Sequence, residues 1–166
     1  MAKKKATAQQ APLQDESAAK ENIATPVVEL LRMYIKDLSL QIPEGAHAFQ
    51  LEWKPELNIE VNTQGKSVSE PNHYEVAVRL KVTNTCGGKV AFIAEAIQAG
   101  LFRIEHLDEL GLKQAFGVVC PNILYPFLRE TIGDTVLRAG FPQLNLAAMN
   151  FELMASQAGA AGQTIQ

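Results

Sequence analysis

The chain is predicted to be an α+β domain in which a four-stranded antiparallel sheet is followed by a long helix and a short C-terminal helix. Two observations predict this class. Between residues 33 and 98, apolar and polar side chains alternate with a period of two, which is typical of strands with one buried and one wet face. From residue 107 onward the apolar side chains follow helical spacing instead. Strands followed by helices indicate helices packed on one face of a sheet.

The strand pattern is clearest from Phe49 to Asn62, where every second residue is apolar or proline. Pro55 lies inside this stretch and cannot donate to a sheet ladder, so it marks an edge strand or an interruption. Residues 74–82 repeat the alternation. Residues 84–88 form a turn in which Gly87 and Gly88 supply positive φ.

The other two strands have weaker patterns. In residues 90–98, Phe92 points to one side of the strand, whereas Ile93 and Glu95 point to the other. Residues 33–42 form a strand that ends before Pro43. The connections permit four antiparallel strands in sequence, so we expect a meander.

Helical spacing predicts a short helix over residues 107–116 and a long one that begins at Pro121. A proline in the first turn of a helix costs no hydrogen bond. Gly140 is placed as the C-terminal stop of the long helix. Residues 141–148 form an apolar loop, and Asn150 caps the last helix.

These helices are too small to cover one face of the sheet. Four strands about 40 Å long present roughly 770 Å² per face at a spacing of ~4.8 Å. A helix of about 19 residues covers roughly 280 Å². The apolar remainder is therefore expected to meet another subunit, a client chain, or both.

Bulk properties favour one domain that stays in the cytosol. The chain has 166 residues and a net charge of −3, which argues against a nucleic-acid partner. Residues 1–25 and 156–166 are expected to be disordered tails on a folded domain of residues 26–155. No apolar run follows the lysines at the N-terminus, so neither a signal peptide nor direct membrane insertion is expected. Cys86 and Cys120 are expected to be two reduced, inert thiols.

No catalytic constellation can be assembled from the sequence. His47, His73 and His106 lie in different loops or element ends, without metal-ligand spacing. The segment from Cys86 to Lys89 lacks the first glycine and the hydroxyl residue of a phosphate loop. We therefore expect a binding protein that is not an enzyme and needs no cofactor or metal.

Two features suggest binding surfaces. The first is a surplus of aromatic and methionine side chains, which adapt to many partners but can equally form an ordinary core. Its members are Trp53, Phe92, Phe141, Met149, Phe151 and Met154. The second is a wet sheet face that carries Asp37, Ile93 and Glu95, which can equally be a solvated acidic face.

Two sequence blocks lie one helix length apart. The first is Cys120-Pro121-Asn122-Ile123-Leu124-Tyr125-Pro126-Phe127-Leu128-Arg129-Glu130. The second is Gly140-Phe141-Pro142-Gln143-Leu144-Asn145-Leu146-Ala147, and Asn150-Phe151 follows it. At this separation they resemble the SecB family of bacterial protein-export chaperones. Four strand segments support the resemblance: Tyr34 to Ser39, Trp53 to Glu56, Tyr74 to Val76 and Ala91 to Glu95. The resemblance spans about residues 34–151, in order and without large gaps.

The resemblance implies an ATP-independent cytosolic chaperone that holds secretory precursors unfolded and delivers them to the translocation motor SecA. It also implies a homotetramer built as a dimer of dimers. The motor-binding positions of the family fall on Asp37, Ile93 and Glu95, and a further acidic position is Gln41 here. Positions implied in client binding or assembly are Phe49, Trp53, Leu57, Phe92, Ala94, Ala96, Gln98, Met149, Phe151 and Met154.

Two other functions stay open at this point. One is a SecB-like chaperone dedicated to a single partner, such as a toxin–antitoxin system. The other is a non-enzymatic module that binds an apolar small molecule in its groove. The first predicts activity toward one client only, and the second predicts one saturable ligand per subunit and no holding activity.

Overall fold

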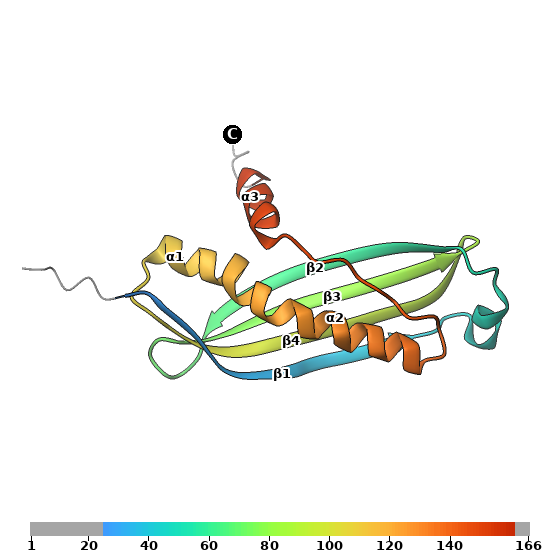
Figure 1. The fold of residues 1–166 in the computed structure, drawn as a ribbon, viewed down its shortest axis with the longest axis horizontal. Helices are drawn as coiled ribbons and strands as arrows, with labels where there is room; N and C mark the ends of the chain where they lie inside the picture. The colour runs from blue at the N-terminus through green and yellow to red at the C-terminus, as the bar shows by residue number, and fades with distance from the viewer. Residues whose placement is uncertain (1–24, 162–166) are drawn as a thin grey trace, which may run out of the picture.

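The computed structural model describes residues 25–161 and confirms the predicted α+β class (Figure 1). Its sheet contains the four strands β1 (Val27–Gln41), β2 (Pro55–Ser67), β3 (His73–Cys86) and β4 (Lys89–Glu105). Their order across the sheet is β1-β4-β3-β2, and every neighbouring pair is antiparallel. The long helix lies along one face of this sheet, and no helix of the described residues covers the opposite face (Figure 1).

The expected meander is wrong at β1, which pairs with β4 and not with β2. Strands β2, β3 and β4 follow one another by hairpins, and β1 then adds beside the last of them, as in a Greek key. The apolar side chains of β1 explain this placement, because Leu30 lies opposite Phe102 and Leu40 lies opposite Ala94. The central position of β4 buries residues on both of its faces, which a strand at the edge could not do.

Strand β2 begins later than its alternating pattern predicted. Residues Gly45–Gln50 form a 3₁₀ helix, η1, and the ladder starts only at Pro55. Pro55 is the first residue of an edge strand, which is where a residue without an N–H is tolerated. Phe49 and Trp53 therefore lie outside the sheet, and their alternation did not indicate a strand.

The turn between β3 and β4 contains the predicted Gly87 and Gly88, but the predicted start at residue 84 is wrong, because β3 continues to Cys86. Gly87 and Gly88 have φ of +57° and +78°, as a two-residue type I′ turn requires. Beyond it, β4 runs to Glu105, past the predicted end at residue 98. Strand β1 is also longer than predicted and begins at Val27.

The two predicted helices before Gly140 form one continuous helical segment. Helix α1 (Glu109–Gln114) passes into a π-helical turn, η2 (Ala115–Val119), and then into α2 (Cys120–Arg138). Pro121 has no N–H, and its ring would crowd the carbonyl four residues earlier in a regular helix. The wider turn, in which the Cys120 N–H reaches the Ala115 carbonyl, accommodates that proline without ending the helix.

Gly140 ends α2 as predicted. The Phe141 N–H donates to the Val136 carbonyl and the Gly140 N–H donates to the Leu137 carbonyl, which together form a Schellman motif. The glycine has φ of +92°, a conformation that side chains disfavour.

An extended segment, residues 141–150, follows α2 and is called the strap below. It runs back over the sheet to α3 (Phe151–Ala161) (Figure 1). The Asn150 Oδ1 accepts from the Leu153 N–H (2.9 Å), so the predicted cap is present. Helix α3 includes the start of the tail expected from residue 156. The rest of that tail and residues 1–24 lie outside the described residues.

The core lies between α2 and one face of the sheet, called the helix face below. Its strand side comes from the predicted alternation in β3, and its helix side comes from helically spaced residues of α2. These buried residues are Val76, Val78, Leu80, Val82, Leu124, Leu128, Ile132 and Val136. Helix α2 packs mainly on β4 and β3, and apolar residues on the helix face of the two outer strands remain exposed. The area estimate for an uncovered apolar face is therefore confirmed.

Candidate functional site

An aromatic cluster stands at one end of the helix face, with Phe141 of the strap at its centre. Phe141 is buried and stacks on Phe49 of η1 with ring centroids 4.8 Å apart. Its ring also lies 6.0 Å from Trp53 and 5.0 Å from Phe92. The Schellman turn that ends α2 places Phe141 here, so the cluster joins segments that are distant in sequence.

Two outer members of this cluster are open to solvent. Phe49 is 54% exposed and Trp53 is 39% exposed. Leu57 and Ile59 continue from them along the helix face of β2, at 43% and 41% exposure. The apolar strip defined by these four residues lies beside the core but is covered by no element in the described part of the chain. Large side chains left open in one contiguous strip indicate an interaction surface.

A groove continues this strip toward the other end of β2. It has a volume of about 950 Å³ and lies between β2, the α1–η2 segment and α3. Val61, Leu110, Val118 and Met154 supply apolar walls. Phe151 closes its base and packs edge-on against Tyr125 (centroids 5.6 Å apart), so α3 is anchored beside the groove. Met149 is half-buried against the same core.

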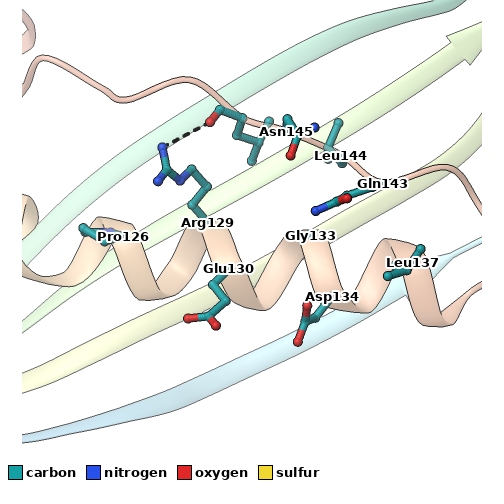
Figure 2. Close-up of a pocket in the computed structure, with 10 residues that line it drawn as sticks. Pro126, Arg129, Glu130, Gly133, Asp134, Leu137, Gln143, Leu144 and Asn145 are labelled. Atoms are coloured by element: carbon teal, nitrogen blue, oxygen red, sulfur yellow. Dashed lines mark hydrogen bonds between the residues drawn. The ribbon is translucent and has the colours of Figure 1, made fainter.

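The strap is held in place by side chains of α2. The Tyr125 hydroxyl donates to the Ala147 carbonyl (2.8 Å), and an Arg129 N–H donates to the Leu146 carbonyl (3.3 Å; Figure 2). Between strap and helix lies a second hollow with charged walls that include Glu130 and Asp134 (Figure 2). Burial raises the pKa of the Tyr125 phenol, so its proton stays in place for this hydrogen bond.

Several predicted client-binding residues lie in the core. Phe92, Ala94, Ala96 and Gln98 are all at most 4% exposed, on the helix face of β4. They pack beneath α2, and Phe151 is likewise 1% exposed. These buried side chains do not form an exposed client surface in this arrangement, and their part in client binding or assembly stays a prediction. Phe49, Trp53, Leu57 and Met154, by contrast, line the open surface.

The opposite side of the sheet, called the open face below, brings the three predicted motor-binding residues together. The register places Glu95 opposite Ser39 and Ile93 opposite Gln41. Asp37 lies opposite Ile97, which is two residues from Glu95 on β4. The Asp37 side chain is therefore on the same face as Glu95. Asp37 is exposed, and Ile93 and Glu95 are half-buried.

Cations surround the acidic groups on the open face. Arg79 of β3 holds both Glu95 oxygens, at 2.7 and 2.9 Å. This bidentate hydrogen bonding lowers the pKa of Glu95 below its usual value, and the positive charge of Lys81 lowers it further. Farther along the face, hydrogen bonds from Lys36 and Tyr34 likewise lower the pKa of Glu75. The open face is therefore a mixed-charge surface in which Glu95 is already paired.

Sequence reasoning missed three contributors to these surfaces. Ile59 belongs to the same alternating pattern as Leu57, so its parity could have identified it. Leu110 extends the groove, but its helical position gives no signal of that role. Arg79 has the correct parity for the open face, yet only the β3–β4 register, which pairs Arg79 with Ile97 beside Glu95, brings it to the carboxylate.

Residues 25–161 contain neither a metal-ligand cluster nor a membrane-spanning helix. No group of three or more potential metal-ligating side chains occurs there. None of the helices described has the length and apolarity needed to cross a bilayer. Cys86 and Cys120 are both buried and unpaired with each other, and burial raises the pKa of Cys120 to about 12.

Comparison with known proteins identifies the family of this chain. The family described as preprotein translocase subunit SecB matches residues 21–161. A protein-export protein SecB of Pseudomonas fluorescens is 41% identical over 144 residues, which cover 87% of this chain and 89% of that relative. Its counterpart in Hahella chejuensis is 43% identical, covering 80% of this chain and 83% of the relative.

A solved structure shows the same fold at low identity. It is a SecB-like chaperone of Mycobacterium tuberculosis, in complex with a peptide from an antitoxin, with a TM-score of 0.54 and 17% identity. The structural match covers 74% of this chain and 90% of the Mycobacterium tuberculosis chain. The fold and the open apolar groove define a protein with a surface suited to apolar partners. The chain belongs to the SecB family of protein-export chaperones.

Proposed function

We propose that this chain is an ATP-independent chaperone that holds secretory precursors unfolded in the cytosol and delivers them to SecA. The observation that carries the proposal is the open apolar strip of Phe49, Trp53, Leu57 and Ile59, which continues into the groove beside α3. A contiguous apolar strip on the surface of a folded protein indicates that another molecule covers it.

The strip and groove suit an unfolded chain better than a folded partner. Burial of apolar surface stabilises a complex by roughly 25 cal/mol per Å² and needs no particular sequence. Aromatic and methionine side chains adapt to differently shaped clients. An extended segment can therefore lie along β2 with apolar residues toward the strip, whatever their order.

Holding requires only binding, without chemical energy. A protein that binds the unfolded chain and not the native one shifts the folding equilibrium by mass action. If four subunits share one client, each later contact is intramolecular, and avidity can exceed single-site affinity by ~10²–10⁴. We therefore include the homotetramer, a dimer of dimers, in the proposal.

Exposed apolar residues outside the groove support assembly. Ile35 and Leu38 of the outer strand β1 are 50% and 43% exposed, and Phe127 and Leu137 of α2 are 45% and 52% exposed. These four residues lie apart from the strip, so they are available for contacts between subunits. Light scattering at micromolar concentration should give about four times the 18.1 kDa chain mass. A monomer at every concentration would contradict the assembly.

The open face is proposed as the SecA-docking surface, with Asp37 and Glu95 as charged contacts and Ile93 as the apolar one. Its position supports this, because it lies across the sheet from the strip and can be occupied while a client is held. Glu95→Lys or Asp37→Lys should abolish docking and leave client holding intact. Normal docking of Glu95→Lys across a salt titration would refute the assigned site.

The experiment that tests the holding function is suppression of aggregation of an unfolded secretory precursor in the absence of ATP. Leu57→Asp places a charge in the strip at an exposed position and should reduce holding without loss of fold. Gln64→Glu is the matched control, since it adds the same charge on the open face of the same strand. Equal holding by both variants would exclude the strip as the client site.

The same assay separates the alternatives. A chaperone dedicated to one partner should protect a single client and fail with other precursors. This alternative is kept because the SecB-like chaperone of Mycobacterium tuberculosis was solved in complex with an antitoxin peptide. A module for an apolar small molecule should protect none and should bind one ligand per subunit. Protection of several unrelated precursors is the expected result.

A further inference from the structure

Asn84 is a buried polar side chain with an unused hydrogen-bond donor. It lies on β3 and is 1% exposed. Its Oδ1 accepts a weak hydrogen bond from the Cys86 thiol (3.9 Å), whereas its Nδ2 has no partner among the described residues. Buried donors are nearly always paired, because an unpaired one loses its hydration without replacement. The Asn84 Nδ2 is therefore a buried donor that a bound partner could satisfy.

The strand register places Asn84 directly beside the open strip. Its cross-strand neighbours on the helix face are Leu57 on β2 and Phe92 on β4. Leu57 is 43% exposed, so Asn84 is one strand away from solvent. Phe92 contacts Phe141, whose ring also stacks on Trp53. The orphan donor thus borders the same aromatic cluster that ends the strip.

The segment that carries Trp53 into this cluster is weakly held. Residues 51–54 belong to no helix or strand. In the described part of the chain, their one backbone hydrogen bond outside regular elements runs from the Lys54 N–H to the Glu52 carbonyl (2.9 Å). Segments with few backbone hydrogen bonds open at low free-energy cost. The segment that carries Trp53 is therefore expected to open more readily than the β2–β3 ladder.

We propose that the Asn84 Nδ2 group donates a hydrogen bond to a backbone carbonyl of an extended apolar client segment, which enters when Trp53 moves aside. The inference rests on the proposed function and adds a backbone-reading residue to the strip. A peptide carbonyl fits because it is a neutral acceptor flanked by apolar side chains. A carboxylate would bring an uncompensated charge into an apolar site.

Such a contact explains how client recognition can be both sequence-tolerant and specific for unfolded chains. Every residue of an unfolded segment carries a carbonyl, whereas the carbonyls of a folded protein are already paired in its own helices and sheets. One fixed donor beside an apolar strip therefore selects extended, unpaired backbone and makes no demand on side-chain identity.

Asn84→Leu tests the donor, with reduced and carboxyamidomethylated α-lactalbumin as a permanently unfolded probe. Leucine has similar size and no polar group, so it should raise the unfolding midpoint while weakening probe binding by about fivefold, the equivalent of one net hydrogen bond. These opposite signs are the readout, since a merely structural asparagine would alter stability without a loss of affinity. Asn58→Leu, on the open face of β2, should leave probe affinity unchanged.

A second measurement changes the backbone of the bound peptide. A short synthetic peptide of alternating leucine and lysine is compared with versions in which single central amides are replaced by esters, which weaken the adjacent carbonyl as an acceptor. The wild-type chain should lose affinity at one or two positions, and Asn84→Leu should show no such positional sensitivity.

Two outcomes would overturn the inference, in distinguishable ways. If the wild type binds the probe and Asn84→Leu binds it as tightly or more tightly, the Asn84 Nδ2 group makes no hydrogen bond to the client. The inference then fails, and the proposed function stands. If the wild type binds neither probe nor peptide, the proposed function fails and the inference fails with it.

Discussion

Removal of the Arg79 charge should strengthen docking of a basic SecA surface. The Glu95 carboxylate is proposed to contact SecA, and Arg79 already forms an ion pair with it. Both Glu95 oxygens lie within 2.9 Å of Arg79 nitrogens. Arg79→Met keeps an apolar stem against the sheet and frees the carboxylate. The substitution also changes the net charge from −3 to −4.

The expected magnitude follows from the position of the pair. An incoming cation at about 4 Å from a free carboxylate gains ~1 kcal/mol in water and up to ~4 kcal/mol at an effective dielectric constant of 20. With side-chain exposures of 42% for Arg79 and 23% for Glu95, the lower value applies. A gain of about 1 kcal/mol corresponds to roughly fivefold tighter docking. The cost in folding stability should be small, as for other exposed pairs.

The assay is equilibrium binding to SecA at low and at high salt. Lys66→Met is the matched control, because it removes one positive charge from the same face near Glu75, away from Asp37 and Glu95. Arg79→Met should bind more tightly than this control at low salt, and the difference should shrink at high salt. Weaker binding by Arg79→Met at both salt concentrations would refute the reasoning and would make Arg79 itself the contact.

The Arg79–Glu95 pair also predicts a pH dependence. Pairing lowers the pKa of Glu95 in the folded state relative to the unfolded chain. Its contribution to stability is therefore fully present above the unfolded pKa and disappears as pH falls through the folded pKa. The difference in unfolding free energy between wild type and Arg79→Met should be constant at neutral pH and should vanish on acidification. A difference that grows in acid would contradict the assignment.

Three further predictions concern the fold around the site. Gly140→Ala should lower the unfolding free energy by about 1–2 kcal/mol in urea titrations, because φ is +92° there; an unchanged midpoint would exclude that strain. Asn150→Ala should cost about 1 kcal/mol through loss of the α3 cap, and a helix signal and stability equal to wild type would show that the cap is dispensable. Cys86 and Cys120 should resist iodoacetamide in the native state and react after unfolding, since both are buried and the Cys120 pKa is raised to about 12; native labelling detected by mass spectrometry would show that the core opens.

Local physics accounts for what the sequence determined. The alternation in β3 indicated which of its side chains are buried, because a strand has only two faces. Gly87-Gly88 predicted the hairpin, and Gly140 and Asn150 predicted a helix end and a helix start, since each of these residues acts on its own neighbours. The parity of Ile93 and Glu95 followed from the same two-residue period.

Tertiary structure decided the features that depend on contacts between distant segments of the chain. The alternation from Phe49 to Pro55 looked like a strand, but Phe49 and Trp53 are apolar because they stack on Phe141, far along the chain. Strand β1 pairs with β4, and this central position buries more of β4 than an edge position would, a gain that no local pattern records.

The candidate site divides in the same way. Residue parity placed Asp37, Ile93 and Glu95 on one face, but only the register between strands brought Arg79 onto the Glu95 carboxylate. Nothing in the sequence distinguishes Asn84 from a solvated asparagine in a turn; its unpaired amide follows from burial between two neighbouring strands. Local periodicity specifies the face of an element, whereas partners across elements are selected by the total burial and pairing of the folded chain, which only its three-dimensional arrangement defines.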